Sequence, residues 1–181
     1  MNTPPSPAPR VAAPSFWLDA DVLLFRALGA GRGSSVTMRL AVRWAQWSWC
    51  VLLGLVLWAC ALQSLSWIAA SGLLLYAGLL QWISKRLARR WSAVRPFALG
   101  LCPNHLKHSG RAGFPSSHAL VMGVITGGLL ASDSATALSA TALCVLVSTA
   151  WARVHTGAHF PSDVVVGAVA GIGLGQWLLA W

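Results

Sequence analysis

Two histidines, an arginine and an aspartate lie together in residues 152–163, between two long apolar segments. The segment reads Ala-Arg-Val-His-Thr-Gly-Ala-His-Phe-Pro-Ser-Asp. Asp163 follows His159 by four positions and is one of only four acidic residues in the chain. A carboxylate that accepts the Nδ1 hydrogen of an imidazole leaves Nε2 as a nucleophile or base, and a guanidinium binds phosphate through two parallel hydrogen bonds. The segment therefore predicts phosphate chemistry by His159, Asp163 and Arg153.

A second set of polar residues lies at the start of another apolar segment, in the sequence Phe-Pro-Ser-Ser-His at residues 114–118. The first N–H groups of a helix lack internal partners and favour an anion. His118 would stand just inside this helix, where it could donate a proton to a leaving oxygen. Arg95 supplies a second guanidinium. Asp163 is the only acid in these loops, so we expect a reaction without a metal or other cofactor.

The composition is that of an integral membrane protein with one domain. Hydrophobic residues make up 56% of the 181 residues and charged residues 9%, and mean hydropathy is +0.65. A soluble domain has roughly a quarter charged residues. The net charge is +9, but the basic residues flank apolar segments, so lipid headgroups are the expected partner and nucleic acid is not.

The apolar segments predict an all-α membrane bundle with about five transmembrane helices. Residues 44–84 contain no charge over 41 positions, which is enough for two helices joined by a turn near residues 63–66. Three further spans are predicted at 115–131, 135–152 and 163–181. In the last of these, glycines at small-xxx-small spacing predict close helix packing, namely Gly167, Gly171 and Gly175.

The segment before the first span is predicted to lie on the membrane surface. Residues 15–31 combine apolar side chains at helical spacing with Asp19 and Asp21, which argues against a span and for an interfacial helix. Residues 1–14 are predicted to be a disordered tail, preceding a membrane domain of residues 15–181. Five spans would bring the N-terminal region, residues 85–114 and residues 152–163 to one side, which also carries all 13 Lys and Arg residues.

Three segments resemble the signature motifs of the type-2 phosphatidic acid phosphatase family, whose pattern is Lys-x6-Arg-Pro, Pro-Ser-Gly-His and Ser-Arg-x5-His-x3-Asp. The resemblance covers roughly residues 85–171. It implies a helical bundle that hydrolyses phosphate esters or pyrophosphates without metal, with His159 as nucleophile, Asp163 as its orienting partner and His118 as general acid. It also implies phosphoryl binding by these residues: Arg95, Arg153, Ser116 and the backbone of Ser117.

The chain departs from that pattern at three positions. Ala88 occupies the position of the family's lysine, so Arg89 or Lys85 is expected to substitute for it. Ser117 replaces a glycine, and Ala152 replaces the serine before the arginine. Both histidines, Asp163 and both arginines are present, so we expect activity. For the neighbouring cations Arg86, Arg89 and Arg90, the alternative is that they only anchor the chain to headgroups.

Within the family, Arg95-Pro96-Phe97, the short chain and the loop of residues 104–108 look most like bacterial undecaprenyl pyrophosphate phosphatases. This resemblance implies hydrolysis of a polyprenyl pyrophosphate to the monophosphate, in the bacterial inner membrane. It also implies an extracytoplasmic site, although the bias of positive charge favours the cytoplasmic side. The alternatives are a phosphatase for phosphatidic acid, phosphatidylglycerophosphate or lipid A, and a non-catalytic protein that binds anionic lipids.

Overall fold

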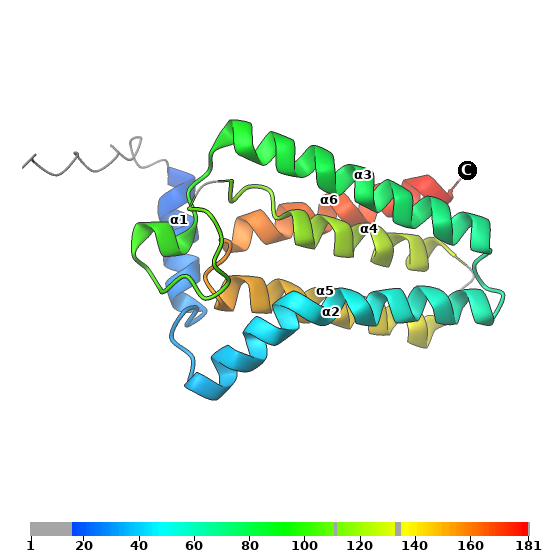
Figure 1. Cartoon of the computed structure of the whole chain (residues 1–181), viewed down its shortest axis with the longest axis horizontal. Coiled ribbons are helices and arrows are strands. Elements are labelled where there is room, and N and C mark those ends of the chain that lie inside the picture. Colours follow the sequence, from blue (N-terminus) through cyan, green and yellow to red (C-terminus); the bar gives the residue numbers. More distant parts are fainter. Residues whose placement is uncertain (1–15, 111, 133–134, 181) are drawn as a thin grey trace, which may run out of the picture.

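The computed structural model describes residues 16–110, 112–132 and 135–180, and this part of the chain is helical and contains no strand. The tail predicted at 1–14 lies outside the described residues. The all-α prediction is confirmed. The elements, in chain order, are α1 (Phe16–Ala27), α2 (Ser35–Ala61), α3 (Trp67–Trp91), the 3-10 helix η1 (Pro96–Leu99), α4 (Ser117–Ala131), α5 (Thr136–His155) and α6 (Pro161–Leu179) (Figure 1).

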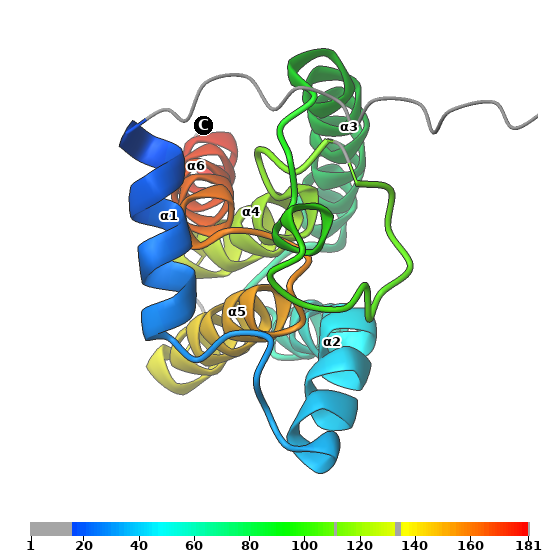
Figure 2. The same cartoon turned by 90° about the vertical axis from the view of Figure 1, so that its left-hand side faces the viewer.

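Helices α2 to α6 run along the bundle, and α1 crosses one end of it (Figure 1). Four helices in the described residues are long and apolar enough to cross a membrane, judged by length and composition: α2, α3, α5 and α6. The predicted third span is the shorter α4, whose 15 residues extend about 22 Å. Viewed along the bundle, α4 lies among the other helices (Figure 2), and most of its residues are buried.

Two helices extend beyond the uncharged segments that predict them. Helix α2 begins at Ser35, where the Oγ of Ser34 accepts a hydrogen bond from the N–H of Thr37 at 3.1 Å. Helix α3 continues through the cationic run to Trp91 and ends at Ser92, which has left-handed backbone with φ 50°. An uncharged run marks the part of a helix in hydrocarbon, whereas Lys and Arg are good helix formers and extend it into the headgroup region.

Glycines bring α4 and α6 into close contact, as the small-xxx-small spacing predicts. A Cβ on Gly171 would collide with the carbonyl oxygen of Leu120, and one on Gly175 with that of Val124. The N–H of Ser116 donates to the carbonyl oxygen of Asp163 at 3.0 Å, so the first turns of the two helices start side by side. This packing places the two polar motifs of the sequence at the same end of the bundle.

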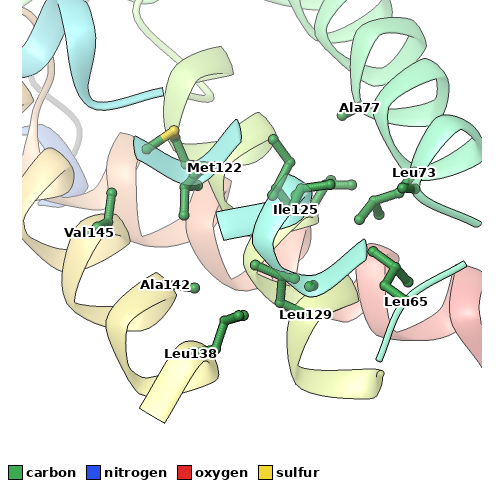
Figure 3. Close-up of a cluster of buried hydrophobic side chains, with 14 of the residues drawn as sticks. Leu65, Leu73, Ala77, Met122, Ile125, Leu129, Leu138, Ala142 and Val145 are labelled. Atoms are coloured by element: carbon green, nitrogen blue, oxygen red, sulfur yellow. The ribbon is translucent and has the colours of Figure 1, made fainter. Parts of the chain in front are cut away.

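The other end of the bundle holds a large apolar cluster. Figure 3 shows side chains from α3, α4, α5 and the turn after α2 pointing toward one another. Leu73 and Leu129 are fully buried within this cluster. It supports the helices at the end where residues 62–66 connect α2 to α3 (Figure 1).

Candidate active site

His159 lies in the connection between α5 and α6 and is 2% exposed. Its Nδ1–H donates to the carbonyl oxygen of Gly113 at 2.8 Å, which fixes the ring and leaves the Nε2 lone pair available. Burial, together with the charges of Arg153 and Arg95, holds the pKa of His159 well below its ordinary value. The imidazole is therefore neutral at pH 7, as a nucleophile or base must be.

Two buried arginines converge on this imidazole. A terminal nitrogen of Arg95 (Nη1) and one of Arg153 (Nη2) each lie 3.2 Å from Nε2 of His159. Arg95 is held in place by the carbonyl oxygens of Ala158 at 2.6 Å and Ala112 at 2.9 Å. The Nε atoms of both arginines are buried and have no hydrogen-bond partner among the described residues. Such donors are costly to bury unpaired, so the arrangement fits an anion at His159.

A cavity of about 300 Å³ opens over His159 and brings most of the predicted site residues together. Two arginines, two cations of α3 and the start of α4 meet around it, and none of the residues lining it is acidic. The lining residues are Lys85, Ala88, Arg89, Arg95, His108, Ser109, Ala112, Pro115, Ser117, His118, Arg153 and His159.

Asp163 does not accept the hydrogen bond that the sequence predicts for it. Its Oδ2 lies 3.7 Å from Nδ1 of His159 and instead accepts the N–H of Phe160 at 2.8 Å. Helix α6 begins at Pro161, so Asp163 occupies its third position, from which a carboxylate reaches back to cap the preceding N–H. The carbonyl of Gly113 therefore orients the imidazole, while the carboxyl of Asp163 caps the start of α6 beside it.

Ser116 is placed differently from its predicted role in phosphoryl binding. It is fully buried, does not line the cavity, and its Oγ caps α4 by accepting the N–H of Ala119 at 3.4 Å. Ser117 does line the cavity and is the first residue of α4. Its φ is not positive, so a serine fits where the family pattern has glycine. Ser116 therefore serves as the cap of α4, and Ser117 is the serine that lines the cavity.

Residues 67–181 match the sequence model of the PAP2 superfamily. The chain belongs to the PAP2 superfamily. Members of this superfamily are membrane lipid phosphatases, so this multi-pass protein is a hydrolase of lipid phosphates. The type-2 phosphatidic acid phosphatase resemblance of its three motifs is thereby confirmed at the level of the superfamily.

Two crystal structures of bacterial proteins are similar to this PAP2 protein. Aquifex aeolicus LpxE superposes with a TM-score of 0.70 at 22% identity, over 88% of this chain and 94% of LpxE. The PAP2 type phosphatidylglycerolphosphate phosphatase of Bacillus subtilis has a TM-score of 0.43 at 22% identity, over 90% and 93% of the two chains. A search of curated proteins found no match. At this identity, the LpxE superposition supports the fold alone.

The cavity lining shows which cations of α3 lie near Ala88, the position at which the family has its lysine. Lys85 and Arg89 lie one helical turn apart on α3 and both line the cavity, beside Ala88. Arg86 lies outside it, with its guanidinium 4.5 Å from the centre of the Trp82 ring. Arg90 is also absent from the lining. Two of the four cations in residues 85–90 therefore line the cavity, and two do not.

The site also contains groups that the motifs do not reveal. Nε2 of His108 lies 3.2 Å from Nη2 of Arg153. Burial and the charges of Arg153, Arg95 and Lys85 lower the pKa of His108 to about 4, so it is neutral at pH 7 and accepts a hydrogen bond from Arg153. The sequence motifs assign no role in the site to His108 or to Gly113. A histidine in a loop and a backbone carbonyl have no fixed spacing from a motif that would identify them.

Proposed function

We propose that this PAP2 phosphatase hydrolyses a polyprenyl pyrophosphate, of the undecaprenyl type, to the monophosphate through a phosphohistidine at His159. The observation that carries the proposal is the position of Nε2, which lies 3.2 Å from each of two buried guanidinium groups. A phosphoryl group held by Arg95 and Arg153 would present its phosphorus to that nitrogen. The hydrogen bond from Nδ1 to Gly113 keeps the reactive lone pair on Nε2.

Two steps follow from the groups around the cavity. Nε2 of His159 forms a bond to the terminal phosphorus, and the bond from phosphorus to the bridging oxygen breaks. His118, which lines the same cavity, donates a proton to that oxygen, so the polyprenyl monophosphate leaves. A water, deprotonated by His118, then attacks the phosphohistidine and releases phosphate. The carboxylate of Asp163, 3.7 Å from Nδ1, stabilises the positive charge that the imidazole carries between the steps.

The charge of the cavity supports a pyrophosphate over a single phosphate. Arg95 and Arg153 meet at His159, while Lys85 and Arg89 line the cavity from α3. Four cations without an acid among the lining residues match the charge of two linked phosphates. The resemblance of the Arg95-Pro96-Phe97 segment to undecaprenyl pyrophosphate phosphatases supports the same substrate.

The test is phosphate release from a panel of purified lipids in detergent, with His159→Ala as the control. Undecaprenyl pyrophosphate should give the highest kcat/KM, against phosphatidic acid, phosphatidylglycerophosphate and lipid A. A higher kcat/KM on one of the monophosphate esters would replace the proposed substrate with that lipid. A protein that binds all of these lipids but releases no phosphate would instead be a non-catalytic lipid-binding protein.

The phosphohistidine has a separate test. His159→Ala should abolish an acid-labile phosphoenzyme, whereas His118→Ala should still form it on a substrate whose leaving group needs little protonation. The described residues contain no group of three or more His, Cys, Asp or Glu side chains that could hold a metal. Activity is accordingly expected to survive EDTA, and strict dependence on added magnesium after chelation would contradict the mechanism.

We propose further that the site faces the extracytoplasmic side of the bacterial inner membrane. The bias of positive charge opposes this, but Lys85, Arg89, Arg95 and Arg153 line the cavity and are explained by phosphate binding. The test uses Ala98→Cys at the site end and Leu62→Cys at the other end, each in a cysteine-free background. In intact spheroplasts, a membrane-impermeant maleimide should label position 98 and not position 62. The opposite labelling would place the site in the cytoplasm.

A further inference from the structure

Helix α1 lies against the connection that carries His159, although it lies outside the residues that match the PAP2 superfamily. The match begins at residue 67, whereas α1 spans Phe16–Ala27. Figures 1 and 2 show α1 crossing the end of the bundle beside the start of α6. The superfamily sequence alone therefore does not account for this contact.

Three contacts join α1 and the turn after it to the segment from His155 to Ser162. At one end, the N–H of Gly31 donates to the carbonyl oxygen of His155 at 2.9 Å. In the middle, the buried ring of Phe25 packs edge-on against Phe160, with ring centres 6.0 Å apart. At the other end, the two carboxylate oxygens of Asp21 accept hydrogen bonds from Ser162, one from its N–H at 3.1 Å and one from its Oγ–H. The contacts hold both ends of the 156–160 connection.

The contact at Asp21 supplies a cap that the sequence of α6 lacks. The first N–H groups of a helix need acceptors from outside it. The N-cap position of α6 is Phe160, whose side chain has no oxygen, and Pro161 has no N–H. Asp21 therefore takes the place of an N-cap side chain for the N–H of Ser162, and its negative charge suits the positive end of the helix.

The exposed residues of α1 include both apolar and charged side chains. Leu23 and Leu24 are exposed on α1 together with Asp19 and Arg26, and Leu28 is exposed just after the helix. Phe25 is buried against Phe160. Because α1 crosses the bundle direction, it would lie in the plane of a membrane surface when the long helices span that membrane (Figure 1). The exposed leucines then contact lipid, while Phe25 contacts Phe160 and Asp21 contacts Ser162 in the first turn of α6.

We propose that Asp21 is a positioning residue for phosphate transfer: from a helix on the membrane surface, it caps α6 and thereby fixes His159 between Arg95 and Arg153. The proposal rests on the role of His159 proposed above. Asp21 touches neither the cavity nor the reacting atoms, so its loss should misplace the nucleophile and leave the phosphate-binding cations of α3 in position. The expected signature is a lower kcat with little change in KM.

The experiment compares Asp21→Ala with Asp19→Ala, which removes an exposed carboxylate from the same helix. Asp21→Ala should lower kcat roughly tenfold, because small misplacements of a reacting group are costly. Asp21→Asn keeps one acceptor oxygen, so its kcat should lie between those of Asp21→Ala and the unmodified protein. Ser162→Ala keeps the N–H but loses the hydroxyl, so it should lower kcat less. The double variant Asp21→Ala/Ser162→Ala should be no slower than Asp21→Ala, because both changes remove the same contact.

Two controls separate this proposal from the proposed function. Turnover by His159→Ala would overturn the assigned nucleophile, and with it the role of Asp21. If His159→Ala is inactive, equal kcat values for Asp21→Ala and Asp19→Ala, or a change in KM alone, would overturn the role of Asp21 only. If Asp21→Ala does not fold, the kcat of Ser162→Ala tests the proposal in its place. An unchanged kcat in Ser162→Ala would contradict the proposal.

Discussion

Both ends of the helical bundle contain buried side chains, but these are charged or polar at the site end and apolar at the other end. At the site end, the protein encloses Arg95, Arg153 and His159. At the other end, it encloses the apolar cluster that includes Leu73 and Leu129. Burying like charges costs free energy that a substrate anion would offset, whereas apolar burial stabilises the fold directly. Substitutions at the site end should therefore mainly change activity, and substitutions at the other end should mainly change the free energy of unfolding.

The largest effect is expected at the centre of the site. Arg153→Gln should lower kcat/KM by about 10²–10³-fold, since it removes a charged donor aimed at the phosphoryl group. The free energy of unfolding should stay the same or rise, because a buried cation beside Arg95 is removed. Activity assays and thermal melting in detergent measure the two quantities. Arg90→Gln, on α3 outside the cavity, is the control.

The opposite pattern is expected at the other end. Leu129→Ala should lower the free energy of unfolding by about 2–5 kcal/mol, because it leaves a space in a fully buried apolar cluster. At a temperature where the variant is folded, kcat should match that of the unmodified protein. Leu75→Ala, at a position 77% exposed, is the control for the loss of a leucine. A large drop in kcat with unchanged stability in Leu129→Ala would show that the two ends are coupled.

The sequence predicts the far end of the molecule better than the details of the site. Uncharged segments are long enough to predict the helices, and the glycine spacing predicts close packing by α6, because both depend on local periodicity. That α4 is the partner of α6 comes from the structure. The motifs also predict that His159, Arg153 and Arg95 meet. They do not predict the Gly113 carbonyl as the partner of Nδ1, because every residue has such an oxygen. The contact of Asp21 with Ser162 joins positions 141 residues apart, and neither belongs to a motif.

A smaller effect tests the division of cations on α3. Arg89→Ala should lower kcat/KM by about tenfold, because its side chain lines the cavity and one charge-assisted hydrogen bond to phosphate contributes about 1.5–3 kcal/mol. Arg86→Ala, which removes a cation packed on Trp82 outside the cavity, should have little effect. Lys85→Ala should resemble Arg89→Ala. Equal small losses in all three variants would mean that this run only anchors the helix to headgroups.

The smallest expected effect concerns His108, whose pKa is lowered to about 4 in the folded protein by burial and by Arg153, Arg95 and Lys85. In the unfolded chain, His108 takes up a proton as the pH falls through about 6.5, whereas the folded protein leaves it neutral. The unfolded state then binds more protons, so the contribution of His108 to stability is lost progressively as pH falls from about 6.5 toward 4. The lowered pKa of His159 likewise makes the folded state less stable as the pH falls.

His108→Gln should therefore lose less stability between pH 7 and about pH 5 than the unmodified protein, because glutamine does not titrate and still offers an oxygen to Arg153. Thermal melting at several pH values in one detergent measures the difference. His105→Gln lies in the same loop but outside this cavity, and serves as the control. If the melting temperatures of His108→Gln and the unmodified protein fall in parallel as the pH is lowered, His108 is protonated in the folded site. The site would then present a further cation to phosphate at acidic pH, and the contrast between the two ends would be larger than the structure indicates.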